Sequence, residues 1–171
     1  MSHIMIDLET LGTGNNARIL SVGMVKFNES EILDRKYFVI DQKSAKGDID
    51  FDTVKWWLNQ SDKAKQVFYE QADWSEWLLA EMIIDYLETH KVETVWANSP
   101  RFDIVILDSL LQRHGKKPIS FWIQRDYRTI RELFPLDNPP TADIPHNALD
   151  DAVCQVEVLQ AILSQYNITL R

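Results

Sequence analysis

His-Ile-Met-Ile-Asp-Leu-Glu (HIMIDLE), residues 3–9, is the stretch that decides the fold. Its alternation of residue types predicts a β-strand, in which successive side chains point to opposite faces. Asp7 and Glu9 therefore leave the same face roughly 7 Å apart. Two carboxylates on one face of a core strand repel each other and lose solvation, and a divalent cation would relieve both costs. A strand with that face in solvent would explain the pair equally well.

The rest of the first half also has the pattern of strands. Residues 19–27 form an apolar run, and residues 32–40 are rich in β-branched and aromatic side chains. Turn-forming residues at 12–16 and 28–31 separate these segments. Three successive strands with short connections predict an antiparallel meander.

The second half is mostly helical in pattern. Amphipathic or apolar segments predict helices, and two short segments predict further strands. The expected helices are 51–59, 61–69 with Ser61 as N-cap, 75–89, 102–114 and 148–166, and the expected strands are 94–97 and 121–127. Four prolines make residues 134–146 a stiff loop. The predicted fold class is α/β, with an RNase H-like mixed β-sheet (antiparallel meander plus parallel strands) flanked by helices.

Length and composition suit a single domain spanning residues 1–171. Cys154 is the one cysteine, which rules out an internal disulfide and fits a reducing compartment. With neither a long apolar span nor a signal pattern, the expectation is a cytoplasmic protein without membrane contact. The net charge of −8 argues against nonspecific binding of duplex nucleic acid, but a metal-dependent enzyme that grips a few nucleotides is compatible with it.

Three further polar residues lie where elements begin. Asp103 opens the predicted helix 102–114, while His146 and Asp151 flank the start of the last helix. Each alone has a plainer explanation: an acid favoured by the helix dipole, or a histidine in a surface loop. Together with Asp7 and Glu9 they stand in the order and element context that a site for two metal ions requires.

This set resembles the DEDDh exonuclease superfamily. Its three motifs would be Asp7-Leu8-Glu9-Thr10, residues 98–103 (NSPRFD) and residues 146–151 (HNALDD). Asn147 stands where the tyrosine form of the superfamily has its tyrosine, which indicates the histidine form. Residues 54–61 (VKWWLNQS) and 121–129 (FWIQRDYRT) are further similar to the phage-like group of exonuclease VIII nuclease domains and phage exonuclease A. The resemblance extends from residue 4 to about residue 163.

The resemblance implies a 3′–5′ exonuclease that hydrolyses single-stranded RNA or DNA to nucleoside 5′-monophosphates with two Mg²⁺ or Mn²⁺ ions. Asp7 would bridge the two ions. Glu9 and Asp151 would hold the ion that binds the attacking water, and Asp103 would hold the other. His146 would take the proton from the water, since histidine changes charge near neutral pH.

Substrate contacts are expected around these motifs. Thr10 and the backbone near Leu8 would hold the terminal nucleotide, and Leu11 is either a wedge against the last base or a core residue. Adjacent tryptophans on one helix cannot both face the cleft, so one of Trp56 and Trp57 should lie in the core. The expected substrate-binding set is Leu8, Thr10, Leu11, Trp57, Gln60, Asn98, Arg125 and Arg128, with Arg131 completing a basic cluster that ordinary surface arginines would equally explain.

Several alternatives stay open at this point. Preference for RNA or DNA depends on contacts to the 2′-hydroxyl, so an RNA-trimming role and DNA degradation are both compatible with these residues. A catalytically silent RNase H-like nucleic-acid-binding or accessory module is the alternative outside the enzymes. The expected partner is the 3′ end of a single strand, and a homodimer is left open.

Overall fold

The computed structural model describes residues 2–170. Its elements, in chain order, are β1 (His3–Thr10), β2 (Ile19–Phe27), β3 (Ile32–Val39), α1 (Phe51–Leu58), the 3₁₀ helix η1 (Ala64–Phe68), α2 (Glu76–Thr89), β4 (Thr94–Ala97), α3 (Asp103–Arg113), the 3₁₀ helix η2 (Phe121–Ile123), β5 (Gln124–Asp126), α4 (Tyr127–Leu133) and α5 (Ala148–Tyr166).

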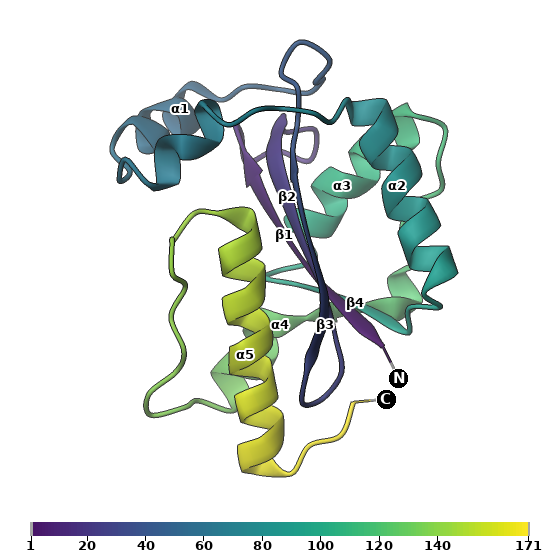
Figure 1. The fold of residues 1–171 in the computed structure, drawn as a ribbon, viewed down its shortest axis with the longest axis vertical. Coiled ribbons are helices and arrows are strands. Elements are labelled where there is room, and N and C mark those ends of the chain that lie inside the picture. The colour runs from purple at the N-terminus through teal and green to yellow at the C-terminus, as the bar shows by residue number, and fades with distance from the viewer. Residues whose placement is uncertain (1, 171) are drawn as a thin grey trace.

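The strands form one mixed sheet in the order β3-β2-β1-β4-β5 (Figure 1). β1 pairs antiparallel with β2, and β2 pairs antiparallel with β3. β4 runs parallel to β1 and to β5. The predicted α/β class, with an antiparallel meander extended by parallel strands, is therefore confirmed. The strand order also places β1, with its two acids, in the middle of the sheet.

Helices cover both faces of the sheet (Figure 1). On one face Ile4, Ile6 and Leu8 of β1 pack in a core with α2 and α3. On the other face Met5 packs in a core with Trp96 and the buried side of α5. This division follows from the alternation of side chains along a strand. It means that Asp7 and Glu9, in register with Met5, point towards α5.

A third, smaller apolar cluster joins α1 and η1 to the start of β2, around Leu20 and Trp57. The predicted helix 61–69 is wrong in extent and type, because only the 3₁₀ helix Ala64–Phe68 forms. Its buried residues, Ala64 and Val67, are three apart, which matches the 3.0 residues per turn of a 3₁₀ helix. Ser61 Oγ does accept a hydrogen bond from the Ala64 N–H at 3.1 Å, as the predicted cap requires.

The segment 121–127 is also corrected. A 3₁₀ turn fills its first half, β5 is confined to Gln124–Asp126, and the unanticipated helix α4 follows at once. Asp126 explains the switch, because its carboxylate accepts from the Arg128 N–H and from Thr129 Oγ1. These bonds cap a helix start and end the strand.

The proline-rich connection between α4 and α5 contains no helix or strand, as expected. None of the helices described between residues 2 and 170 combines the length and apolar character needed to cross a membrane.

Candidate active site

Gly23 brings the start of α5 against the sheet. It lies opposite Asp7 in the β1–β2 register, and a Cβ placed on it would lie 2.1 Å from the carbonyl oxygen of Ala148. Only a residue without a side chain permits this approach. Asn147 caps the helix by accepting from the backbone N–H groups of the second and third helical residues. Asp151 and the residues that follow it on α5 thus lie over β1.

Gln155, one turn after Asp151, reaches the first acid. Its Nε2 donates to Asp7 Oδ1 at 2.7 Å. Helical residues four apart share a face, so Gln155 and Asp151 both point to the sheet. Gln155 is a site residue that sequence reasoning missed, although its spacing from Asp151 was a usable signal.

Asp103 arrives from the other side of the sheet, at the start of α3. β4 ends its pairing with β1 at Ala97, opposite Ile6. The N–H of Leu8, beyond that point, donates to Asp103 Oδ1 at 3.1 Å. Asp103 is 2% exposed, and its other oxygen, Oδ2, is buried with no hydrogen-bond partner among the described residues. A buried carboxylate oxygen without a donor is an available ligand.

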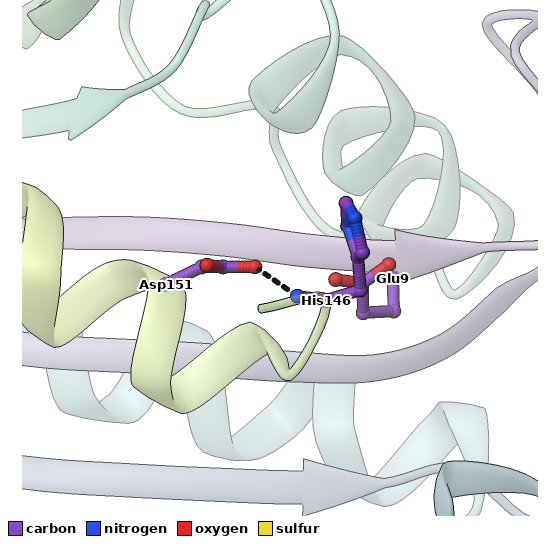
Figure 2. A group of neighbouring side chains, drawn as sticks. All are labelled: Glu9, His146 and Asp151. Atoms are coloured by element: carbon purple, nitrogen blue, oxygen red, sulfur yellow. Dashed lines mark hydrogen bonds between the residues drawn. The ribbon is translucent and has the colours of Figure 1, made fainter. Parts of the chain in front are cut away.

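Glu9, His146 and Asp151 form a close group (Figure 2), with one ligand atom of each within 4.8 Å of the others. The N–H of His146 donates to Asp151 Oδ2 at 2.9 Å. His146 has φ of +65°, a left-handed conformation uncommon outside glycine. Its ring stands edge-on to the ring of Trp56, with the centroids 4.7 Å apart. Backbone and ring contacts together fix the imidazole at the acids.

Burial makes ionisation of these acids costly. It raises the pKa of Glu9 to about 8, and the charges of Asp151 and Asp103 add to the effect. Burial also raises the pKa of Asp103 to about 7. For Asp7 burial and then the neighbouring acids hold the pKa well above its ordinary value, and burial raises that of Asp151. Protons or cations are needed to neutralise this cluster.

The donor set fits a divalent metal. Four carboxylates supply hard oxygen ligands, the kind that Mg²⁺ and Mn²⁺ prefer. The unpartnered Asp103 Oδ2 points to a missing electropositive partner.

The acids lie in a cleft of about 1280 Å³. Nine of the residues predicted for the site line it, and they come from β1, the turn after β4, the start of α3, α4, and the start of α5 with the loop before it. These nine are Asp7, Leu8, Glu9, Thr10, Asn98, Asp103, Arg128, His146 and Asp151. The three acidic motifs and the histidine, far apart in the chain, are thus brought together.

Trp57 is a correction. The structure buries it to 2% exposure in the cluster around Leu20, and its Nε1 donates to the Thr10 carbonyl at 2.8 Å. A buried indole cannot stack on a base. Trp56, 42% exposed, lines the cleft instead. Leu11, half-buried, packs against the same cluster as Trp57 and is not among the lining residues, which does not favour a wedge against the last base.

Gln60 and Arg125 also lie outside the cleft lining. Gln60 Nε2 donates to the Trp56 carbonyl at 3.0 Å, which closes the end of α1. Arg125 donates from Nη1 to the carbonyls of Trp122 and Gln124. Both side chains satisfy local backbone oxygens instead of reaching towards the acids.

The cleft has basic residues on one side that sequence reasoning identified only in part. Arg128 Nη2 donates to the Asn98 carbonyl at 3.1 Å, and Arg131 lies one turn away on α4. Arg101 also lines the cleft and was missed, although it lies inside the motif 98–103. The start of α1 also lines the cleft, through Asp52, Thr53 and Trp56 with the cap residue Asp50, and so does the uncharged loop at residues 12–15.

Comparison with known proteins supports an assignment. Residues 2–163 match the family described as the 3′–5′ exoribonuclease Rv2179c-like domain. The chain is 28% identical to the exodeoxyribonuclease of Enterobacteria phage T4 over 184 aligned positions, which cover 90% of this chain and 81% of the phage protein.

Two solved structures have a similar fold. E. coli exonuclease I in complex with a dT13 oligonucleotide superposes with a TM-score of 0.72 at 15% identity, over 97% of this chain. This chain spans only 42% of the exonuclease I chain. The nuclease domain of 3′hExo, a DEDDh family member bound to rAMP, gives a TM-score of 0.63 at 11% identity, covering 99% of this chain and 94% of that domain.

Proposed function

The chain belongs to the 3′–5′ exoribonuclease Rv2179c-like domain family, and from that premise we propose that it shortens single-stranded nucleic acid from the 3′ end, releasing nucleoside 5′-monophosphates. The observation that carries the proposal is the convergence of Asp7, Glu9, Asp103, Asp151 and His146 on one cleft. We propose that residues 1–171 act as one such domain, nearest to the group of exonuclease VIII nuclease domains and phage exonuclease A.

Asp7, Glu9, Asp103 and Asp151 would hold two Mg²⁺ or Mn²⁺ ions. When bound, such ions supply Lewis-acid stabilisation of the attacking and the leaving oxygen. The protein prepares the acids for this task by fixing their positions: Gln155 holds Asp7, and the Leu8 N–H holds Asp103. Because the pKa values of these acids are raised, metal ions and protons compete for the same carboxylate oxygens.

His146 would act as the general base. Its imidazole belongs to the same close group as the Glu9 and Asp151 carboxylates, within reach of a water held between them. The bond from its own N–H to Asp151 Oδ2 couples the loop to the helix that carries a proposed ligand. The base would therefore keep its place relative to the acids when substrate enters.

The residues that line the cleft suggest how a strand would lie. Arg128, with Arg101 and Arg131, would receive the phosphates, and Asn98 would be positioned by its bond to Arg128. Trp56, also in the lining, offers an aromatic face, on which any base can stack without sequence preference. Thr10 and Leu8 would lie beside the terminal nucleotide.

The alternative of a catalytically silent binding module is disfavoured by the cost of the site. Four acids whose burial opposes ionisation are costly to the fold, a cost expected where carboxylates are kept to bind metal ions for catalysis. Sugar preference is not decided by these residues, since the matched family is named for RNA and the phage relative for DNA.

The test is incubation of the protein with 5′-labelled single-stranded RNA and DNA oligonucleotides, with Mg²⁺, Mn²⁺ or chelator. We expect a ladder that shortens from the 3′ end, stops at a 3′-phosphate and disappears with chelator. Asp103→Asn serves as the inactive control. Cleavage of circular single strands would contradict an exonuclease, and binding without any cleavage in either metal would favour the silent module.

A further inference from the structure

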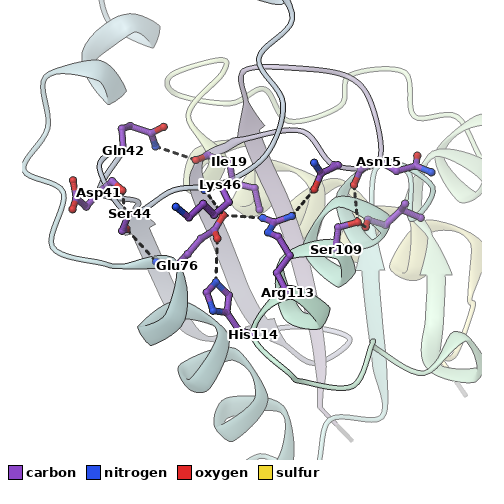
Figure 3. Close-up of polar contacts among 12 residues, drawn as sticks. Asn15, Ile19, Asp41, Gln42, Ser44, Lys46, Glu76, Ser109, Arg113 and His114 are labelled. Carbon is purple, nitrogen blue, oxygen red and sulfur yellow. Dashed lines mark hydrogen bonds and ion pairs between the residues drawn. The ribbon is translucent and has the colours of Figure 1, made fainter.

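A buried polar cluster lies outside the acidic site, where α2 begins and α3 ends (Figure 3). Glu76, the first residue of α2, is 1% exposed. Its Oε1 accepts from the Lys46 N–H at 3.0 Å and from Arg113 Nη2 at 2.8 Å, and its Oε2 lies 3.1 Å from His114 Nε2. Because a buried carboxylate without such partners is very costly, this arrangement is firmly fixed.

Arg113 links this cluster to the loop after β1, because it bonds to Glu76 and also to a residue of that loop. Its second terminal nitrogen, Nη1, donates to Asn16 Oδ1 at 2.7 Å. One turn earlier on α3, Ser109 Oγ donates to the Asn15 carbonyl at 2.8 Å. Figure 3 shows Ser109 and Arg113 near each other, with the Ser109 hydroxyl directed at Asn15 of this loop. The end of α3 therefore holds residues 12–16, here named the cleft loop.

The opposite side of the cleft loop is held as well. The Asp48 N–H donates to the Asn16 carbonyl at 2.7 Å. Gly47 has φ of +105°, and a Cβ on it would lie 2.6 Å from that carbonyl oxygen. Residues 12–16 read Gly-Thr-Gly-Asn-Asn, a composition that has no preferred conformation of its own. The order of this loop comes from its neighbours.

The cleft loop forms part of the cleft wall through Gly12, Thr13 and Asn15. Ser109, which touches the loop, is six residues after Asp103, which is about 9 Å along the axis of α3. Gly12, whose carbonyl accepts from Thr10 Oγ1 at 2.7 Å, adjoins the proposed position of the terminal nucleotide, whereas Asn15, held by Ser109, belongs to the part of the loop that is set along α3 away from Asp103. The cleft loop thus extends the wall beyond the acids, where the further nucleotides of a longer strand would lie.

We propose that Glu76 and Arg113 are positioning residues, which fix the cleft loop for contact with nucleotides upstream of the scissile bond. The proposal rests on the proposed function, because it assigns a substrate contact within that cleft. A loop ordered before binding saves the entropy of ordering it on the substrate, so the pair should affect the affinity for longer strands. Binding and cleavage of a dinucleotide, which occupies only the acidic site, should not depend on Glu76 and Arg113.

The test uses the double variant Asn16→Ala, Ser109→Ala, which releases the cleft loop and leaves the buried Glu76–Arg113 pair intact. We expect KM and the anisotropy Kd for an octanucleotide to rise roughly fivefold. Both quantities for a dinucleotide, and kcat for both substrates, should change less than twofold. Hydrogen exchange at the Ala17 and Arg18 amides, both bonded in wild type, should accelerate. Arg113→Lys, which keeps a charge beside Glu76 and loses the reach to Asn16, should reproduce the length dependence.

Lys116→Ala is the matched control, since it removes the 2.6 Å ion pair with Glu81 between the same two helical regions and leaves the cleft loop untouched. Equal losses for both lengths, or unchanged octanucleotide affinity in a double variant with accelerated exchange, would overturn the proposal. A wild-type protein that binds both oligonucleotides and cleaves neither would contradict the proposed function alone, because the anisotropy measurement still tests the cleft loop.

Discussion

Replacing Glu9 by glutamine should stabilise the metal-free protein, by an amount that depends on pH. Burial, with the charges of Asp151 and Asp103, raises the pKa of Glu9 to about 8 from an ordinary value of 4.5. Between these two pH values the native state holds a proton that the unfolded state has lost. The free energy of unfolding therefore falls as pH rises, by about 1.4 kcal/mol per pH unit.

The size of the effect follows directly. Through Glu9, the free energy of unfolding of the wild-type protein falls by about 3 kcal/mol between pH 4.5 and pH 7. Between pH 4.5 and pH 6 it falls by about 2 kcal/mol. Glutamine has nearly the same shape and no proton to lose, so Glu9→Gln avoids this loss. For a chain of this length about 3 kcal/mol corresponds to a Tm higher by about 6–12 °C at pH 7.

Thermal unfolding in EDTA at pH 5, 6 and 7 measures the difference between variant and wild type. We expect that difference to grow with pH, and to shrink when Mg²⁺ is added, because the wild type keeps the ligand that the variant has lost. Glu31→Gln, at an exposed position before β3, is the control for removing a negative charge. A variant with a Tm below that of wild type at every pH would refute the reasoning, and so would an increase in Tm that does not change with pH.

Four further outcomes are expected. His146→Ala should lower the single-turnover rate by roughly 10²–10⁴-fold while the Mg²⁺ affinity from calorimetry is retained; a near wild-type rate would remove His146 from the mechanism. Chelation should abolish activity and leave the circular dichroism spectrum of the folded chain, since the two cores do not depend on the ions. Gly23→Ala should lower Tm and activity by pushing α5 off the sheet, whereas Gly14→Ala, with nothing within 4 Å of the added Cβ, should affect folding little. Trp56→Ala should raise KM with the stability nearly unchanged, whereas Trp57→Ala should cost about 3–5 kcal/mol of stability, measured by denaturant unfolding.

The main features of the sheet and the acidic site could be predicted because both depend on local periodicity. The two-residue period of β1 places Asp7 and Glu9 on one face, and the N-terminal positions of Asp103 and Asp151 place both acids at helix ends. These features need no knowledge of distant contacts. Eight elements accordingly begin and end within a residue or two of the predicted positions: β1, β2, β3, α1, α2, β4, α3 and α5.

What escaped prediction depends on contacts between distant segments. The choice between Trp56 and Trp57 is made by the Thr10 carbonyl, which accepts from Trp57 Nε1 across 47 residues. The start of α4 depends on the side chain of Asp126, whose capping role competes with its place in an apparent strand. The cleft loop is held by α3 through a hydrogen bond that spans 94 residues, and no local sequence pattern predicts this contact.

The hydrogen bond between Gln155 and Asp7 spans 148 residues, so the centre is closed only once α5, the last of the helices described, has been made. At a translation rate of about 5–20 residues per second, β1 is followed by roughly 7–30 s of further synthesis before α5 exists. Throughout that interval the nascent chain lacks Asp151 and His146. The proposed ligands and the proposed base therefore cannot come together before α5 has been synthesised.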